Sequence, residues 1–71
     1  MTLLSRTENG WVVKSEIQSP LDLKVFDLSG KQLMDRQFNL ETQIKIPKGI
    51  YILRLYNPKS GAIEDYKIYN F

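Results

Sequence analysis

The side chains that could do chemistry in this chain are carboxylates and hydroxyls, because its 71 residues include neither histidine nor cysteine. The usual general base near neutral pH and the usual thiol nucleophile are therefore missing. Glu64 and Asp65 are adjacent, and neighbours on a strand point to opposite faces, so they cannot act alone as a carboxylate dyad. Asp27 and Asp35 flank one predicted hairpin and could approach each other across it. We expect them instead to shape the turn and to pair with Lys31 or Arg36.

Other kinds of reactive site are equally unsupported by the sequence. The five serines have no histidine partner, and no D-x-D-x-D-G calcium loop is present. Gly30, Gly49 and Gly61 are dispersed, so they form no phosphate-binding loop. We therefore predict that the protein is not an enzyme and that it uses no cofactor and no metal.

Charge and hydropathy exclude two further classes. The net charge is +2, and the ten basic residues are interleaved with eight acidic ones, as on a solvated surface of mixed sign. This distribution predicts no nucleic-acid partner. No apolar run approaches the roughly 20 residues of a membrane helix, so no transmembrane segment is predicted. The start, Met1–Arg6, lacks the basic and long apolar regions of a signal peptide.

Alternation of apolar and polar residues predicts strands throughout the chain, with no convincing helical pattern. Turn residues separate the strands: Asn9-Gly10, which favours a type I′ hairpin, then Ser29-Gly30, Pro47–Gly49 and Asn57–Gly61. The predicted strands are Thr2–Glu8, Trp11–Ile17, Leu23–Leu28, Gln32–Phe38, Thr42–Ile46, Ile50–Asn57 and Ala62–Tyr69.

Short strands with turns about every 8 to 12 residues predict an all-β fold, a small immunoglobulin-like antiparallel β-sandwich of about seven strands. A partly open barrel is the alternative. Leu23–Leu28 is apolar on both faces and should be central in its sheet, whereas Gln32–Phe38 should lie at an edge. Trp11 and Tyr51 could belong to a carbohydrate-binding platform, but we expect both in the core, because small β domains need large side chains there.

Two motifs carry a family resemblance. The first is a hairpin, Val25-Phe26-Asp27 followed by Gly30-Lys31 and Leu33, and the second is the run Ile46–Leu53 with Gly49 and Tyr51; Lys67-Ile68 follows near the end. Their order and spacing resemble the C-terminal sorting domain, type A-like, of proteins exported by the bacterial type IX secretion system. The resemblance covers roughly residues 23 to 71.

The resemblance implies that residues 1–71 are a single sorting-type domain from the C-terminus of a larger secreted protein. Such a module is recognised by the outer-membrane translocon, and a sortase-like enzyme usually removes it. The cargo reaches the cell surface or the medium through the periplasm and outer membrane of a Gram-negative bacterium. By the same resemblance, Gly30, Gly49 and Tyr51 would be structural, and Lys31, Lys67 and Ile68 would contribute to recognition.

The chain departs from the family pattern at both ends. No "P-N-P" segment precedes Trp11, and the last residues are Tyr69-Asn70-Phe71 where relatives often end on a basic residue. Two alternatives remain open: an accessory module of a secreted enzyme, packing on the catalytic domain or binding glycans, and a module that self-associates through its edge strands. Ile63–Phe71 is expected to form an edge strand or to end on one, which would offer unpaired backbone groups to a partner. The alternative is that it is simply the last strand of the sheet, protected by Glu64, Asp65 and Lys67.

Overall fold

The computed structural model describes residues 2–71, which form seven strands and no helix. All seven predicted strands are present, and their ends differ from the predicted ranges by at most two residues. No segment among the described residues is a helix long and apolar enough to cross a membrane. The strands are β1 (Thr2–Thr7), β2 (Gly10–Ser15), β3 (Leu21–Asp27), β4 (Gln32–Phe38), β5 (Glu41–Lys45), β6 (Gly49–Tyr56) and β7 (Ile63–Asn70).

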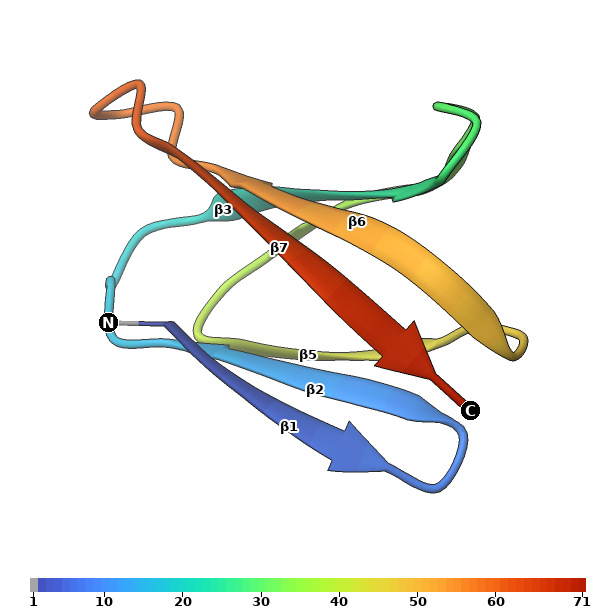
Figure 1. Cartoon of the computed structure of the whole chain (residues 1–71). Helices are drawn as coiled ribbons and strands as arrows, with labels where there is room; N and C mark the ends of the chain where they lie inside the picture. The colour runs from blue at the N-terminus through green and yellow to red at the C-terminus, as the bar shows by residue number, and fades with distance from the viewer. Residues whose placement is uncertain (1) are drawn as a thin grey trace.

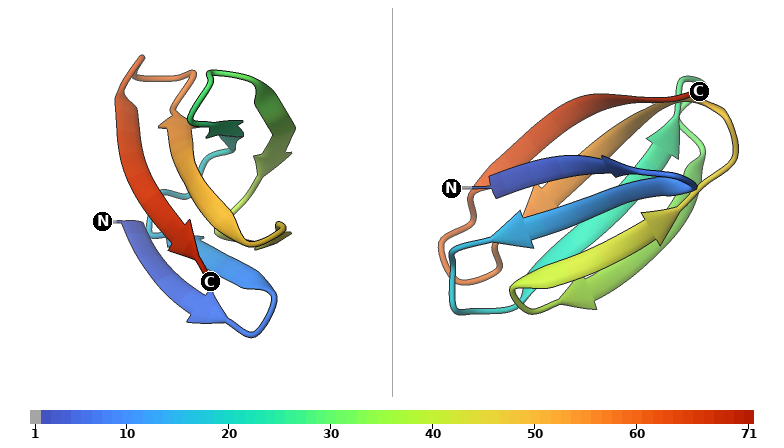
Figure 2. Two further views of the ribbon diagram at one scale, coloured as in Figure 1. Left: turned by 45° about the vertical axis from the view of Figure 1, so that its right-hand side comes forward. Right: turned by 90° about the horizontal axis from the view of Figure 1, so that it is seen from below.

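The strands form two antiparallel sheets packed face to face, as Figures 1 and 2 show. One sheet has the order β1-β2-β5 and the other the order β4-β3-β6-β7. This confirms the predicted seven-stranded β-sandwich. The pairing of β2 with β5 and of β3 with β6 gives the Greek-key connectivity of immunoglobulin-like sandwiches, with the fourth strand added to the sheet of the third, sixth and seventh. β3 is central and β4 is an edge, as predicted.

The core lies between the sheets and is built from alternate residues of every strand except β1. Along β6, for example, Tyr51, Leu53 and Leu55 are buried while Arg54 and Tyr56 point to solvent. Complete burial of such an apolar side chain contributes about 1.5–3 kcal/mol. The buried apolar residues are Val13, Leu21, Leu23, Val25, Phe38, Ile44, Ile46, Tyr51, Leu53, Leu55 and Ile68.

The two aromatic residues expected in the core differ in depth. Tyr51 is 6% exposed and belongs to the core, which confirms the prediction. Trp11 is partly buried and packs against the core from β2, with the Arg6 guanidinium 5.5 Å from the centre of its ring. Trp11 therefore packs against the core beneath Arg6 and does not form part of an open aromatic platform.

The first hairpin differs from the prediction. Thr7 pairs with Gly10, so the turn residues are Glu8 and Asn9, and Gly10 does not have a positive φ. The reason Gly10 is required is a close approach: a β-carbon built on it would lie 1.9 Å from the carbonyl oxygen of Ile44. The prediction of an Asn9-Gly10 type I′ turn was wrong, because the glycine serves the contact between β2 and β5.

Candidate binding surface

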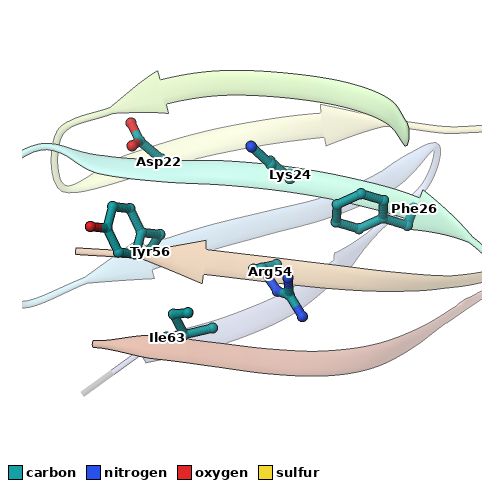
Figure 3. A pocket seen from close by; sticks show the side chains of 6 residues that line it. All are labelled: Asp22, Lys24, Phe26, Arg54, Tyr56 and Ile63. Atoms are coloured by element: carbon teal, nitrogen blue, oxygen red, sulfur yellow. The ribbon is translucent and has the colours of Figure 1, made fainter. Parts of the chain in front are cut away.

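The outer face of the β4-β3-β6-β7 sheet carries a shallow pocket over its middle strands (Figure 3). Phe26 from β3 lies at one end, and Tyr56 from β6 and Ile63 from β7 lie at the other. Lys24 and Arg54 add positive charges between these ends, and Asp22 adds a negative charge beside Tyr56. The pocket, of about 330 Å³, therefore combines apolar walls with charges of both signs.

Arg54 and Asp65 form the strongest polar contact on this face. The Arg54 guanidinium donates to both carboxylate oxygens of Asp65, at 2.8 and 3.0 Å, and it also lies 5.9 Å from the centre of the Phe26 ring. These hydrogen bonds hold the pKa of Asp65 below its ordinary value and raise the pKa of Arg54. The pair links β6 to β7 in solvent and fixes the position of the guanidinium beside the pocket.

β7 is the edge strand on one side of this sheet, because it pairs only with β6. The amide of Asn57 donates to the carbonyl of Ala62, so the backbone of Ala62 faces β6. Backbone direction alternates along a strand, and the next residues to face β6 are Glu64, Tyr66 and Ile68. The residues between them point their N–H and C=O groups away from the sheet; we call them the open-edge residues, and they are Ile63, Asp65, Lys67 and Tyr69.

A contact from the other sheet agrees with this direction. Arg6 of β1 donates to the carbonyl of Tyr69 at 2.7 Å and to an oxygen of Phe71 at 3.1 Å. β1 and β7 lie along the same side of the sandwich (Figures 1 and 2), and the Arg6 side chain joins them at one end. Within residues 2–71, the backbone groups of Ile63, Asp65 and Lys67 have no such contact from β1 and are available to an added strand.

The opposite side of the sandwich is joined in the same manner. Arg36 of β4 donates to the hydroxyl of Thr42 and to the carbonyl of Gln43, both on β5, at 3.2 and 3.0 Å. Each open side of the two-layer body thus has one arginine that reaches from an edge strand of one sheet to an edge strand of the other. These contacts hold the layers together without forming a closed barrel, so the partly open barrel is not the fold.

The predicted structural residues Gly49 and Tyr51 act together. Gly49 opens β6, and a β-carbon there would lie 3.2 Å from the hydroxyl oxygen of Tyr51. The space left by the glycine admits that hydroxyl, which donates to the carbonyl of Pro47 at 2.8 Å. From β7, the buried Asn70 amide donates to the carbonyls of Ile46 and Pro47. The Gly-x-Tyr spacing and Asn70 therefore clamp the crossover from one sheet to the other.

The first motif is also accounted for by local geometry. The Asp27 carboxylate accepts hydrogen bonds from the amide and hydroxyl of Ser29 and from the amide of Lys31. These bonds, led by the Ser29 hydroxyl, hold the pKa of Asp27 below its ordinary value. Gly30 has a φ of 91°, a left-handed conformation that glycine adopts without strain. Asp27 shapes the turn, as predicted, and it contacts Lys31 through the backbone amide of that residue. Asp35 lies across from Lys24 on β3, and Arg36 donates to β5 instead.

The predicted recognition residues are not brought together. Lys31 is exposed at the β3–β4 turn, and Lys67 is exposed on β7 with its ammonium 5.7 Å from the centre of the Tyr69 ring. Ile68 is only 2% exposed, because it lies on the inner face of β7. Its side chain belongs to the core and is not accessible to a partner in the folded protein, so its expected place among the recognition residues is revised.

The acidic residues form no reactive cluster within the described part of the chain. Glu64 and Asp65 point to opposite faces of β7, as predicted: Asp65 meets Arg54, whereas Glu64 accepts a hydrogen bond from the Tyr66 hydroxyl. That bond, followed by partial burial, raises the pKa of Tyr66. Across residues 2–71, no three acidic side chains gather closely enough to hold a metal ion.

Three residues with important contacts were not predicted: Arg6, Arg36 and Asn70. Asn70 had a usable signal, since a polar residue in phase with the apolar positions Tyr66 and Ile68 indicates a buried hydrogen bond. The two arginines gave no such signal, because each contacts a strand of the other sheet.

No family model, curated protein or solved structure matches this chain.

Proposed function

We propose that this chain is a non-catalytic C-terminal sorting module, read by the type IX outer-membrane export machinery and directing its cargo to the cell surface or the medium of a Gram-negative bacterium. Its partners would be the translocon and a sortase-like processing enzyme. The observation that carries the proposal is the edge position of β7, whose open-edge residues present backbone groups outward.

The motifs behind the resemblance support this reading in a specific way. Gly30 and the Gly49-x-Tyr51 pair are explained by turn and crossover geometry, so they serve the fold that would be recognised. The remaining predicted residue on β7, Lys67, is exposed on the outer face at the open edge. A translocon component that added a strand to β7 would meet Lys67 and the Arg54–Asp65 pair on the same face.

The proposal can be tested with a reporter that carries an N-terminal export signal and this chain at its C-terminus, in a bacterium that has the machinery. Deleting Ile63–Phe71 should abolish surface delivery of the reporter. Unchanged delivery after this deletion would refute the proposal.

Two matched proline variants locate the recognised edge without removing a strand. The N–H of Lys67 points away from β6, so Lys67→Pro removes no ladder hydrogen bond but blocks strand addition to β7. β4 is the edge strand on the other side of this sheet. The backbone alternation can be continued from Asn57 through the pairing of β6 with β3 and of β3 with β4, and it directs the N–H of Asp35 away from β3. We expect Lys67→Pro to stop delivery and Asp35→Pro to preserve it; the reverse result would place recognition on β4.

An accessory glycan-binding module is the second candidate, favoured by the pocket between Phe26 and Tyr56. Tyr56 is 37% exposed and could stack on a sugar ring beside the polar groups of Asp22 and Arg54. On a glycan array, Tyr56→Ala should lose binding, whereas Trp11→Ala should keep it because Trp11 packs against the core. Absence of binding at about millimolar sugar would remove this candidate.

A further inference from the structure

We propose that β7 pairs antiparallel with β7 of a second copy of this chain, in one register, to give a continuous sheet across two sandwiches. In this register Asp65 of each copy lies opposite Lys67 of the other. The proposal concerns the oligomeric state of the chain and does not rest on the proposed sorting function.

The backbone limits the registers that such a dimer can adopt. Two antiparallel strands exchange hydrogen bonds only where the groups of both residues in a pair point at each other. On β7 those residues are the open-edge residues, fixed by two contacts on its two sides: Asn57 to Ala62 toward β6, and Arg6 to Tyr69 away from it. An open-edge residue of one copy must therefore lie opposite an open-edge residue of the other.

The charges then select one of the neighbouring registers. When Asp65 faces Lys67, the symmetry of the pairing repeats the same contact, and Ile63 faces Tyr69 at both ends. Neighbouring allowed registers differ by two residues. A slide of two residues in one direction places Asp65 opposite Asp65 of the second copy, and the same slide in the other direction places Lys67 opposite Lys67. Opposite charges across a strand pair stabilise it and like charges destabilise it, so both neighbouring registers are disfavoured.

The side chains that would meet are already exposed on β7. Ile63 is 57% exposed and Tyr69 is 45% exposed, and the proposed register covers each with the other. Asp65 is held by Arg54 at 2.8 Å, so Lys67 of the second copy would extend an ion pair that is already oriented. The carbonyl of Tyr69 accepts from Arg6, and its second lone pair remains available for the added strand.

Charge reversal tests the register directly. Asp65→Lys places two lysines opposite each other at both contacts, and Lys67→Asp places two aspartates there, so we expect each variant alone to dimerise at least about tenfold more weakly than the parent. Mixed in equal amounts, the two variants have opposite charges at both contacts and should form a heterodimer. Asp35→Lys, the matched change on the other edge strand, should dimerise like the parent. Analytical ultracentrifugation over a concentration series measures the three variants, the mixture and the parent.

Cysteine substitution tests the register independently, because the chain has no cysteine of its own. The proposed register places Tyr66 opposite Tyr66 of the second copy, in a pair with a Cα separation of about 4.5 Å, which a disulfide can span. Tyr66→Cys should therefore form a disulfide-linked dimer on mild oxidation. The Asp65→Cys and Lys67→Cys variants should not form this disulfide, because each residue lies diagonally across from the same residue of the second copy, about 7–8 Å away.

Several results would overturn the proposal. One is a parent chain that stays monomeric up to about 1 mM. Others are a charge-reversed variant that dimerises as well as the parent, a mixture that fails to associate, or cross-linking through position 65 or 67 in place of 66. The charge variants alter only exposed side chains. Lys67→Asp leaves the Arg54–Asp65 pair intact, and the pair that Asp65→Lys removes lies in solvent, where an ion pair contributes little to stability, so a folded monomer is expected in each case. Circular dichroism of each variant verifies that it is folded.

Discussion

Replacing Gly10 by alanine should destabilise the protein strongly, although the backbone conformation there is open to any residue. Gly10 does not have a positive φ, so alanine would ordinarily stabilise this position by about 0.4–1 kcal/mol through the unfolded chain. A β-carbon would, however, lie 1.9 Å from the Ile44 carbonyl oxygen and 3.1 Å from the Lys45 α-carbon. Ordinary contact begins at 3.4 Å, so β5 would have to retreat by roughly 1.5 Å.

The expected cost of Gly10→Ala is about 3 kcal/mol, at the upper end of the range for overpacking, because backbone must move and not a side chain. A protein of this size has a total stability of roughly 4–10 kcal/mol, so the loss is a large share of it. The melting temperature should fall by roughly 12–24 °C. Urea and thermal unfolding followed by circular dichroism measure the change.

Gly30→Ala is the matched control for this prediction. Gly30 has a φ of 91° and no atom within 4 Å of the position where a β-carbon would be, so its cost is conformational and amounts to about 1–2 kcal/mol. We expect Gly10→Ala to cost more than Gly30→Ala. A Gly10→Ala protein as stable as the parent would refute the close pairing of β2 with β5.

Three further changes test the clamp at the crossover and the β3–β4 turn. Asn70→Ala leaves the carbonyl of Ile46 without its buried donor and should cost about 1–3 kcal/mol in urea unfolding, and a neutral result would contradict that contact. Tyr51→Phe removes only the hydroxyl bonded to Pro47 and should cost about 1 kcal/mol by the same assay; no change would show that the bond contributes nothing. Asp27→Asn should lower stability at neutral pH. Because the pKa of Asp27 is lowered in the folded state, the stability from its ionised form is present above the ordinary value of 3.8 and is lost as the pH falls through the folded pKa below it. The gap between parent and variant should narrow over that acid range, and a gap independent of pH would contradict the role of the charge.

The strands and the layering could be predicted from the sequence because alternation is a local signal. Leu53 and Tyr51 fall in phase along β6, and Val25 and Phe26 place apolar side chains on both faces of β3, which correctly indicated its central place. The Asn9-Gly10 turn was placed one residue too late, because the glycine is required by a contact with Ile44, far away in the sequence. A dipeptide preference cannot report such a contact.

The candidate surface could be predicted only in part. The sequence predicted that Ile63–Phe71 forms or ends on an edge strand, and β7 does lie at the edge of its sheet. Ile68 was assigned to recognition by resemblance, although its alternation with Lys67 already indicated an inward side chain. Arg6 and Arg36 could not be predicted, because their contacts depend on how the two sheets face each other.

Amide hydrogen exchange along β7 tests the central claim most directly, since the sorting and dimer proposals both need alternate backbone groups of this strand to be accessible. Measured residue by residue by NMR on the dilute monomeric chain, the amides of Glu64, Tyr66 and Ile68 should be protected by β6, and those of Asp65 and Lys67 should exchange rapidly. Equal protection of all five amides, or the opposite alternation, would contradict the account.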